Sequence, residues 1–263
     1  MSIKHQLPDG TQQWVSAIDP SKFHRLDGPA VITPDGSEYW YIHIPATDIT
    51  PEYSGLHRED GGPAVITSDG LREWHNSKMG TEHTFYRLDG PSVIEPDGTE
   101  KWVQGCKYHR IGGPAITKPN GDKEYYEHGE LHRLDGGPAI DYVNGQKEWY
   151  VHDKWYRADG GPVHINSSGW QEWNVYMLSP ITNKIVRRMH RIDGPASIGP
   201  DNEFYWYYMG NHHRDDGPAI RTSCGTLYWY RHGKLHNDNG PAIIFTDGRK
   251  YWYIDGEFIK SEE

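Results

Sequence analysis

The chain has 263 residues and a formal net charge of -10, and no apolar stretch approaches the roughly 20 residues that a membrane span needs. We therefore expect no membrane contact, and the acidic balance argues against direct DNA binding, because nucleic-acid-binding domains are normally basic. Only Cys106 and Cys224 occur, which excludes a disulfide framework. Since the N-terminus lacks the apolar core of a secretory signal, a cytoplasmic location is expected.

One motif, His-Arg-x-Asp-Gly-(Gly)-Pro-Ala, recurs nine times along the chain. Its prolines are 34, 28, 23, 24, 24, 33, 23 and 23 residues apart, which gives a unit of about 23 residues with three enlarged junctions. Repetition at a near-constant period is typical of repeat proteins, in which each unit packs mainly on its neighbours. The copies begin at His24, His57, Tyr86, His109, His132, Tyr156, His190, His213 and His236.

A turn dipeptide follows each proline, and an aromatic residue stands four positions after the second residue of that turn. The series opens with a half-unit, Gly10 to Trp14, and ends with Gly248 to Trp252. Asp-Gly or Asn-Gly between β-branched and aromatic runs predicts a β-hairpin with a type I′ turn, which needs positive φ at both central residues. A second turn is expected near a glycine in several units, at Gly129, Gly210, Gly233 and Gly256.

Successive strand residues point to opposite faces of a sheet, so the Trp row lies on one face and the aromatic residue after it on the other. One face is expected to pack the core while the other is partly covered. We predict an all-β fold: a single domain over residues 1–263, made of nine antiparallel hairpin units with terminal half-caps, forming an elongated, curved sheet or ribbon. Its open edge strands predict a symmetric homodimer.

An aromatic residue, a glycine turn, His-Arg and Asp-Gly-Gly-Pro-Ala follow one another in Tyr126 to Gly145, and Trp229 to Pro241 shows the same succession with Asn237 and Asn239 in place of the arginine and the aspartate. This succession resembles the Asp-Gly-Pro-Ala repeat proteins of tailed phages and bacteria. It is more loosely similar to the MORN repeat, which usually has Gly-x-Gly where this chain has Asp-Gly-Pro-Ala. The resemblance covers Asp9 to Phe258 and implies a MORN-like β-repeat scaffold without catalytic residues. It further implies contacts with proteins or lipid headgroups. In a phage it implies a counter-defence role in the host cytoplasm, by binding a host protein or a nucleotide signal.

The recurrent histidine and arginine each allow a functional and a structural interpretation. Equivalent histidines of neighbouring hairpins are roughly 9 to 10 Å apart, whereas zinc holds each imidazole nitrogen at about 2.0 to 2.1 Å. We therefore predict no metal site, and a hydrogen bond from each histidine to the backbone at its own Gly-Pro break. The arginine is followed two residues later by aspartate in seven of eight units, Gly112 being the exception. A local Arg-Asp pair is favoured over a stripe of guanidinium groups that binds phosphates.

Departures from the repeat are better candidates for function, because insertions in repeat scaffolds often form the binding face. The enlarged junctions lie at about residues 42–56, 75–85 and 174–189. The third is basic within an acidic protein, and a nearby tyrosine could add stacking to charge in holding an anionic ligand; a solvated loop is the alternative. The candidate ligand- or partner-binding residues are Tyr176, Lys184, Arg187, Arg188, Arg191 and the face tyrosines Tyr207 and Tyr230.

The sequence contains no Gly-x-Ser-x-Gly elbow, Walker loop, His-Glu-x-x-His helix or Cys-x-x-Cys pair. We expect no enzyme, no catalytic residue and no cofactor; a two-carboxylate hydrolase is the alternative, because Asp and Glu are numerous. The leading hypothesis is a repeat binding protein that captures a partner protein through its aromatic β surface and inserted loops. The alternatives are a protein that sequesters a small phosphorylated, nucleotide-type signal, and an acidic mimic of nucleic acid.

Overall fold

The computed structural model describes residues 1–47, 52–75, 85–179 and 182–263, and in these residues every regular element is a β-strand. The chain divides into two compact units, Met1–Leu131 and His132–Glu263, which are described separately. The predicted all-β array of consecutive antiparallel hairpins is confirmed. The single-domain organisation, the curvature and the homodimer stay predictions.

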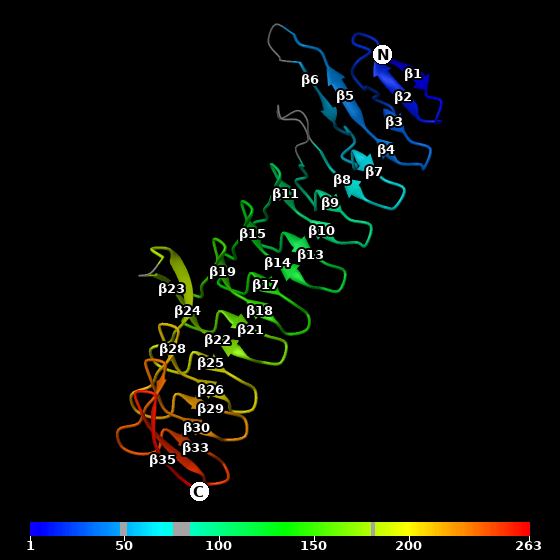
Figure 1. Cartoon of the computed structure of the whole chain (residues 1–263). Helices are drawn as coiled ribbons and strands as arrows, with labels where there is room; N and C mark the ends of the chain where they lie inside the picture. The colour runs from blue at the N-terminus through cyan, green and yellow to red at the C-terminus, as the bar shows by residue number, and fades with distance from the viewer. Residues whose placement is uncertain (48–51, 76–84, 180–181) are drawn as a thin grey trace. The chain divides into compact units, whose positions relative to one another are not determined.

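In the unit Met1–Leu131 the main strands form one antiparallel ladder, in which each strand pairs with those before and after it (Figure 1). Most of these strands have two residues, such as Val31–Ile32 opposite Glu38–Tyr39. The ladder consists of β1 (Ser2–Gln6), β2 (Gln12–Ser16), β3 (Val31–Ile32), β4 (Glu38–Tyr39), β7 (Val65–Ile66), β8 (Arg72–Glu73), β9 (Val93–Ile94), β10 (Glu100–Lys101), β13 (Ile116–Thr117) and β14 (Lys123–Glu124).

In the unit His132–Glu263 the main strands follow one another in the same antiparallel order. The unit ends in a longer hairpin, with a register shift between Trp252 and Tyr253. The strands are β17 (Ile140–Asp141), β18 (Lys147–Glu148), β21 (His164–Ile165), β22 (Gln171–Glu172), β25 (Ser197–Ile198), β26 (Phe204–Tyr205), β29 (Ile220–Arg221), β30 (Leu227–Tyr228), β33 (Ile243–Ile244), β34 (Lys250–Ile254) and β35 (Glu257–Glu262).

After most of the tryptophans the chain forms a second, two-stranded hairpin that is not part of the ladder. This hairpin lies on the side of the ladder opposite its Asp-Gly turns (Figure 1). The Trp40 N–H donates to the Ala64 carbonyl (2.8 Å), and the Trp40 carbonyl accepts from the His57 N–H (3.0 Å). The tryptophan thus joins the ladder and the second hairpin, and the strand is interrupted at this residue, between β4 and β5 (Tyr41–Ile44). The second hairpins are β5 (Tyr41–Ile44) with β6 (Tyr53–Leu56), β11 (Val103–Gln104) with β12 (Lys107–Tyr108), β15 (Tyr126–Glu127) with β16 (Glu130–Leu131), β19 (Tyr150–Val151) with β20 (Lys154–Trp155), β23 (Asn174–Leu178) with β24 (Ile185–Met189), β27 (Tyr207–Tyr208) with β28 (Asn211–His212), and β31 (Tyr230–Arg231) with β32 (Lys234–Leu235).

The two kinds of hairpin use different turns. In the ladder the Gly36 N–H donates to the Thr33 carbonyl (2.9 Å), so Pro34 and Asp35 are the central residues; neither has positive φ, whereas Gly36 after them does (87°). This is a type I turn followed by a left-handed glycine, so the type I′ prediction is wrong for this turn, because Pro34 fixes its own φ near -65°. The type I′ signature occurs in the second hairpin instead, where His128 (50°) and Gly129 (89°) both have positive φ.

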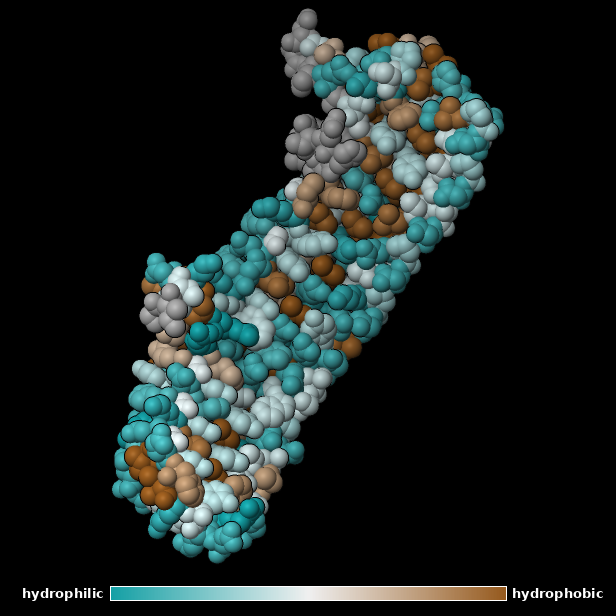
Figure 2. Space-filling model, in the orientation of Figure 1, coloured by the Kyte–Doolittle hydropathy of each residue, from teal (hydrophilic) through white to brown (hydrophobic). Residues whose placement is uncertain are grey.

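The core within each compact unit is a row of small side chains at the places where successive 23-residue repeats join. The alanine of Pro-Ala is fully buried in every copy that has one, and the branched residue after it is mostly buried, as are Trp149 and Trp173. On the surface, apolar residues form separate patches bordered by hydrophilic ones (Figure 2). Over the described ranges, no element is a helix long and apolar enough to cross a membrane. The buried alanines are Ala30, Ala64, Ala115, Ala139, Ala196, Ala219 and Ala242.

Candidate binding site at the inserted hairpin

The arginine of the motif is held by three contacts at its own Gly-Pro break. Arg214 donates from Nε to Asp216 (2.7 Å) and from Nη1 to the Pro218 carbonyl (3.4 Å), and its guanidinium lies 4.2 Å from the centre of the Trp206 ring. The bond from Arg214 lowers the pKa of the Asp216 carboxyl. The predicted local Arg-Asp pair is confirmed, with a tryptophan stack added. The stack recurs for Arg25 on Trp14, Arg58 on Trp40, Arg87 on Trp74, Arg110 on Trp102, Arg157 on Trp149 and Arg191 on Trp173.

The glycine before the proline is required by this arginine. A Cβ on Gly161 would lie 2.5 Å from Cζ of Arg157, and one on Gly217 would lie 3.0 Å from Cζ of Arg214. Any side chain at this position would therefore push the guanidinium off its tryptophan. The recurrence of the His-Arg-x-Asp-Gly-Pro motif is thus explained by packing within the chain.

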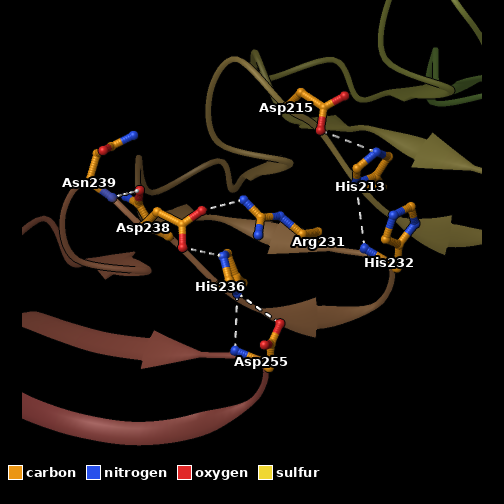
Figure 3. A network of polar contacts seen from close by, with 9 residues as sticks. His213, Asp215, Arg231, His232, His236, Asp238, Asn239 and Asp255 are labelled. Carbon is orange, nitrogen blue, oxygen red and sulfur yellow. Dashed lines mark hydrogen bonds and ion pairs between the residues drawn. The ribbon is translucent and has the colours of Figure 1, made fainter.

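The histidine of the motif binds the next unit and not its own break, which corrects the sequence prediction. Nδ1 of His109 accepts the backbone N–H of His128 (3.2 Å), and the two rings stack with centroids 4.4 Å apart. His213 does the same with His232 (3.4 Å and 4.3 Å; Figure 3). The partner is the first central residue of a type I′ turn, whose N–H has no acceptor within its own hairpin. The histidine row therefore joins successive second hairpins.

The last unit departs from the repeat, and its polar groups are occupied by one another (Figure 3). His236 is buried between two carboxylates, with Nε2 3.0 Å from Asp238 and Nδ1 3.0 Å from Asp255. Arg231 also contacts Asp238 (2.5 Å). Asn237 replaces the motif arginine and keeps one of its bonds, to the Pro241 carbonyl (2.8 Å). In the described part of the chain, no group of three His, Cys, Asp or Glu side chains could hold a metal ion.

The third enlarged junction is an extended second hairpin, which we call the inserted hairpin (residues 174–189). Its strands β23 and β24 have five residues each, against two in most of the others. Tyr176 and Arg187 are opposite each other in register. Oη of Tyr176 accepts the backbone N–H of Trp155 (2.9 Å), and the Arg187 guanidinium lies 4.0 Å from the centre of the Trp155 ring. The inserted hairpin is therefore docked on the second hairpin before it.

The opposite side of the inserted hairpin contacts the second hairpin that follows. A Cβ on Gly210, which has a φ of 88°, would lie 2.5 Å from Cδ of Arg188, so the Arg188 stem lies across that turn. Lys184, Arg187 and Arg188 are all exposed. Residues 174–189 contain no Asp or Glu, so the inserted hairpin contributes three positive charges in a chain of net charge -10.

A groove of about 740 Å³, which we call the Trp173 groove, lies between the base of the inserted hairpin and the motif loops on either side of it. Its volume is within the range of sites that bind a drug-sized ligand. Ile192, at the variable position of the motif, lines this groove and is 87% exposed. The lining is mainly apolar and aromatic, and Asp193 is its one carboxylate among the described residues; the apolar members are Trp155, Val163, Trp173, Val175, Tyr176 and Ile192.

Equivalent grooves between motif loops occur in the unit Met1–Leu131, but they are smaller. The groove at Trp40 has about 510 Å³ and is lined by three carboxylates, Asp27, Glu59 and Asp60. The groove at Trp102 has about 410 Å³. The inserted hairpin thus enlarges a groove that the repeat already provides and makes it more apolar.

The structure brings together some of the residues predicted from the sequence. Tyr176 and Arg191 line the Trp173 groove, while Lys184, Arg187 and Arg188 lie on the inserted hairpin beside it. Arg191 is bonded to Asp193 (3.0 Å) and stacked on Trp173. The face tyrosines do not line the groove: Tyr207 and Tyr230 pack on the His212 ring, at 4.1 Å and 5.3 Å, and burial raises the pKa of both hydroxyls.

The sequence reasoning missed Asn174, Trp155 and Ile192 as groove residues. A signal for Ile192 is present in the sequence, because Leu or Ile fills the same motif position in several other repeats. The structure shows that this residue is strongly exposed there, as with Leu88 (82%). In the other two enlarged junctions, residues 48–51 and 76–84 lie outside the described residues, as do residues 180–181 of the third.

No protein-family model matches this chain, and no curated protein is significantly similar to it. Among solved structures, the chain aligns with the wild-type TCP10 domain of Danio rerio CPAP in complex with a peptide of Danio rerio STIL. That alignment covers 100% of this chain and 99% of the other, at 14% identity and a TM-score of 0.17. A TM-score this low does not establish a shared arrangement of strands.

Proposed function

We propose that this protein is a non-enzymatic repeat binding protein that captures a partner protein at the Trp173 groove and the inserted hairpin. The observation that carries the proposal is the combination of an apolar groove and a carboxylate-free basic hairpin beside it. The other conspicuous groups of the repeat support a scaffold role, because the motif Arg and Asp bind each other and the motif His binds the next turn. Partner capture by inserted elements on a regular scaffold follows the general pattern of repeat proteins.

Site-specific photo-crosslinking in host lysate tests this proposal. A photoreactive benzoylphenylalanine at Tyr176 is expected to form a discrete adduct, whereas the same group at Tyr208 is expected to form none. The two tyrosines are similarly exposed, at 39% and 48%. Filling the groove with Val175→Trp should abolish the adduct while leaving the melting temperature within a few degrees. Equal adducts at both tyrosines, or an adduct insensitive to the filled groove, would contradict the proposal.

Sequestration of a small phosphorylated ligand is the second candidate, favoured by the three exposed cations of the inserted hairpin, Lys184, Arg187 and Arg188. A thermal-shift panel of nucleotides and pyrophosphate tests it, since a ligand at 100 times its Kd should add about 2.7 kcal/mol of stability. No shift across the panel would eliminate this candidate. The acidic mimic of nucleic acid stays a prediction from the net charge, and it requires partner binding that weakens steeply with salt.

A further inference from the structure

The polar groups that line the Trp173 groove are mostly satisfied within the protein. Nε1 of Trp173 donates to the Gly160 carbonyl (2.9 Å), Arg191 is bonded to Asp193, and Nδ1 of His190 accepts the Met209 N–H (3.4 Å). What the groove offers a ligand is therefore chiefly apolar and aromatic surface. Large apolar side chains gain most from such a surface, at roughly 25 cal/mol per Å² removed from water.

Two buried nitrogens of the described groove lining make no hydrogen bond, Nε of Arg157 and Nδ2 of Asn174, and the first of them is paired with Asp159 (2.7 Å). Nδ2 of Asn174 is buried and makes no hydrogen bond, and Asn174 lines the groove. A buried donor without an acceptor costs about 1–3 kcal/mol; since Nδ2 is closed off from solvent, an occupant that supplies an acceptor removes that cost by drawing the Asn174 side chain toward the groove. A main-chain carbonyl is the acceptor that an extended peptide presents at every residue.

Positive charge borders one wall of the groove. The Trp155 ring lines the groove and carries the Arg187 guanidinium on its face at 4.0 Å. Stacking leaves the edge of a guanidinium, with its N–H donors, available to a carboxylate. Arg188 lies toward Gly210 on the other side of the hairpin. It adds positive electrostatic potential near the groove but does not face the Trp155 wall.

We propose that the groove binds an acidic peptide segment of the partner protein with one or two large apolar anchor residues, an inference that rests on the proposed function. The anchors lie over Trp173, a main-chain carbonyl accepts from Asn174, and an Asp or Glu beside the anchor binds Arg187. A free nucleotide fits less well, because its phosphates would need donors on the groove floor, where Trp173 Nε1 is already bonded to protein.

A random-peptide display library selected against the intact protein tests the inference without knowledge of the natural partner. The expected consensus is an aromatic or large aliphatic residue flanked by Asp or Glu, and adding a nucleotide mixture at millimolar concentration should not elute the bound peptides. A selection that returns no consensus, a basic consensus, or peptides eluted by nucleotide would overturn the inference.

Affinities of the selected peptide for four variants assign the contacts. Arg187→Glu should weaken binding at least tenfold, whereas the matched reversal Arg188→Glu on the other side of the hairpin should weaken it no more than about threefold. Ile192 is exposed, so its variants keep the fold: Ile192→Asp should bind at least tenfold more weakly than Ile192→Lys. Equal affinities of these two, or equal effects of the two arginine reversals, would refute the assigned charge contact.

The outcome separates this inference from the function on which it rests. If the Tyr176 crosslink forms but maps to a basic or uncharged segment of the partner, protein capture holds and the acidic-peptide inference fails. If no groove-dependent crosslink forms, protein capture itself fails.

Discussion

Replacement of Arg110 by alanine measures what the recurrent arginine contributes. Arg110 lies 3.9 Å from the centre of the Trp102 ring and donates to the Pro114 carbonyl (3.2 Å), but Gly112 stands where other units have the paired aspartate. A cation on a tryptophan face contributes about 0.5–2 kcal/mol, and a hydrogen bond from a charged donor about 1.5–3 kcal/mol. Because the two share one side chain, we expect Arg110→Ala to lower the free energy of unfolding by about 3 kcal/mol.

Matched variants in the same unit show which contact dominates. Arg87 has the same stack and proline bond plus an ion pair with Asp89 (3.1 Å). The Asp89 carboxylate is well exposed, and exposed ion pairs add little, so Arg87→Ala should cost about as much as Arg110→Ala, and Asp89→Asn much less. Arg110→Asn, which copies Asn237 of the last unit, should recover part of the loss through the proline bond.

Urea unfolding followed by circular dichroism and tryptophan fluorescence gives these differences. If Arg110→Ala is nearly neutral while Arg87→Ala and Asp89→Asn are equally costly, then the ion pair is the stabilising contact and the reasoning from the tryptophan stack is refuted.

Three further predictions concern titration and the chain end. Hydrogen bonds from the Thr222 and Thr226 side chains lower the pKa of the exposed Cys224 thiol to about 7, so in a Cys106→Ser background its alkylation by iodoacetamide should rise with a midpoint near pH 7; a midpoint above 8 would contradict this. Burial lowers the pKa of His190 below its ordinary 6.5, so the unfolded chain takes up the proton first, and stability should fall as pH drops below 6.5. His190→Gln should flatten this dependence in urea titrations between pH 7.5 and 5.5, and an unchanged slope would count against it. Lys260, 4.3 Å from the Trp252 ring on the exposed edge strand β35, is a charge of the kind that blocks edge pairing. Lys260→Leu should therefore increase association in light scattering, and a scattering profile identical to that of the wild type would argue against this role.

The hairpin architecture was predictable because turn, β-branched and aromatic residues agree with one another in every unit. The turn type was not read correctly, although Pro34 before Asp-Gly favours a type I turn. The bond from the His128 N–H to Nδ1 of His109 could not be predicted, because it links residues 19 positions apart in two successive repeats. The repeat period of the sequence does not show which backbone N–H groups of a second hairpin have no acceptor within that hairpin.

The candidate site was predictable in part. Charge and length singled out the inserted hairpin, since Lys184, Arg187 and Arg188 stand out in an acidic chain. The groove was not predictable, because its lining combines Trp155, Trp173 and Ile192 from three separate segments. Tyr207 and Tyr230 looked like binding residues from strand alternation, but aromatic packing around His212 occupies them.

The ladder beside the inserted hairpin is unchanged by the insertion. Gln171 still pairs with Ile198, the Trp173 N–H still donates to the Ala196 carbonyl (2.8 Å), and the His190 N–H to the Trp173 carbonyl (3.2 Å). The residues that set the register are thus separate from those of the proposed binding site. A second hairpin can consequently be lengthened as a module beyond its base, provided that the graft keeps the backbone N–H that the preceding motif histidine accepts, as His109 accepts the N–H of His128.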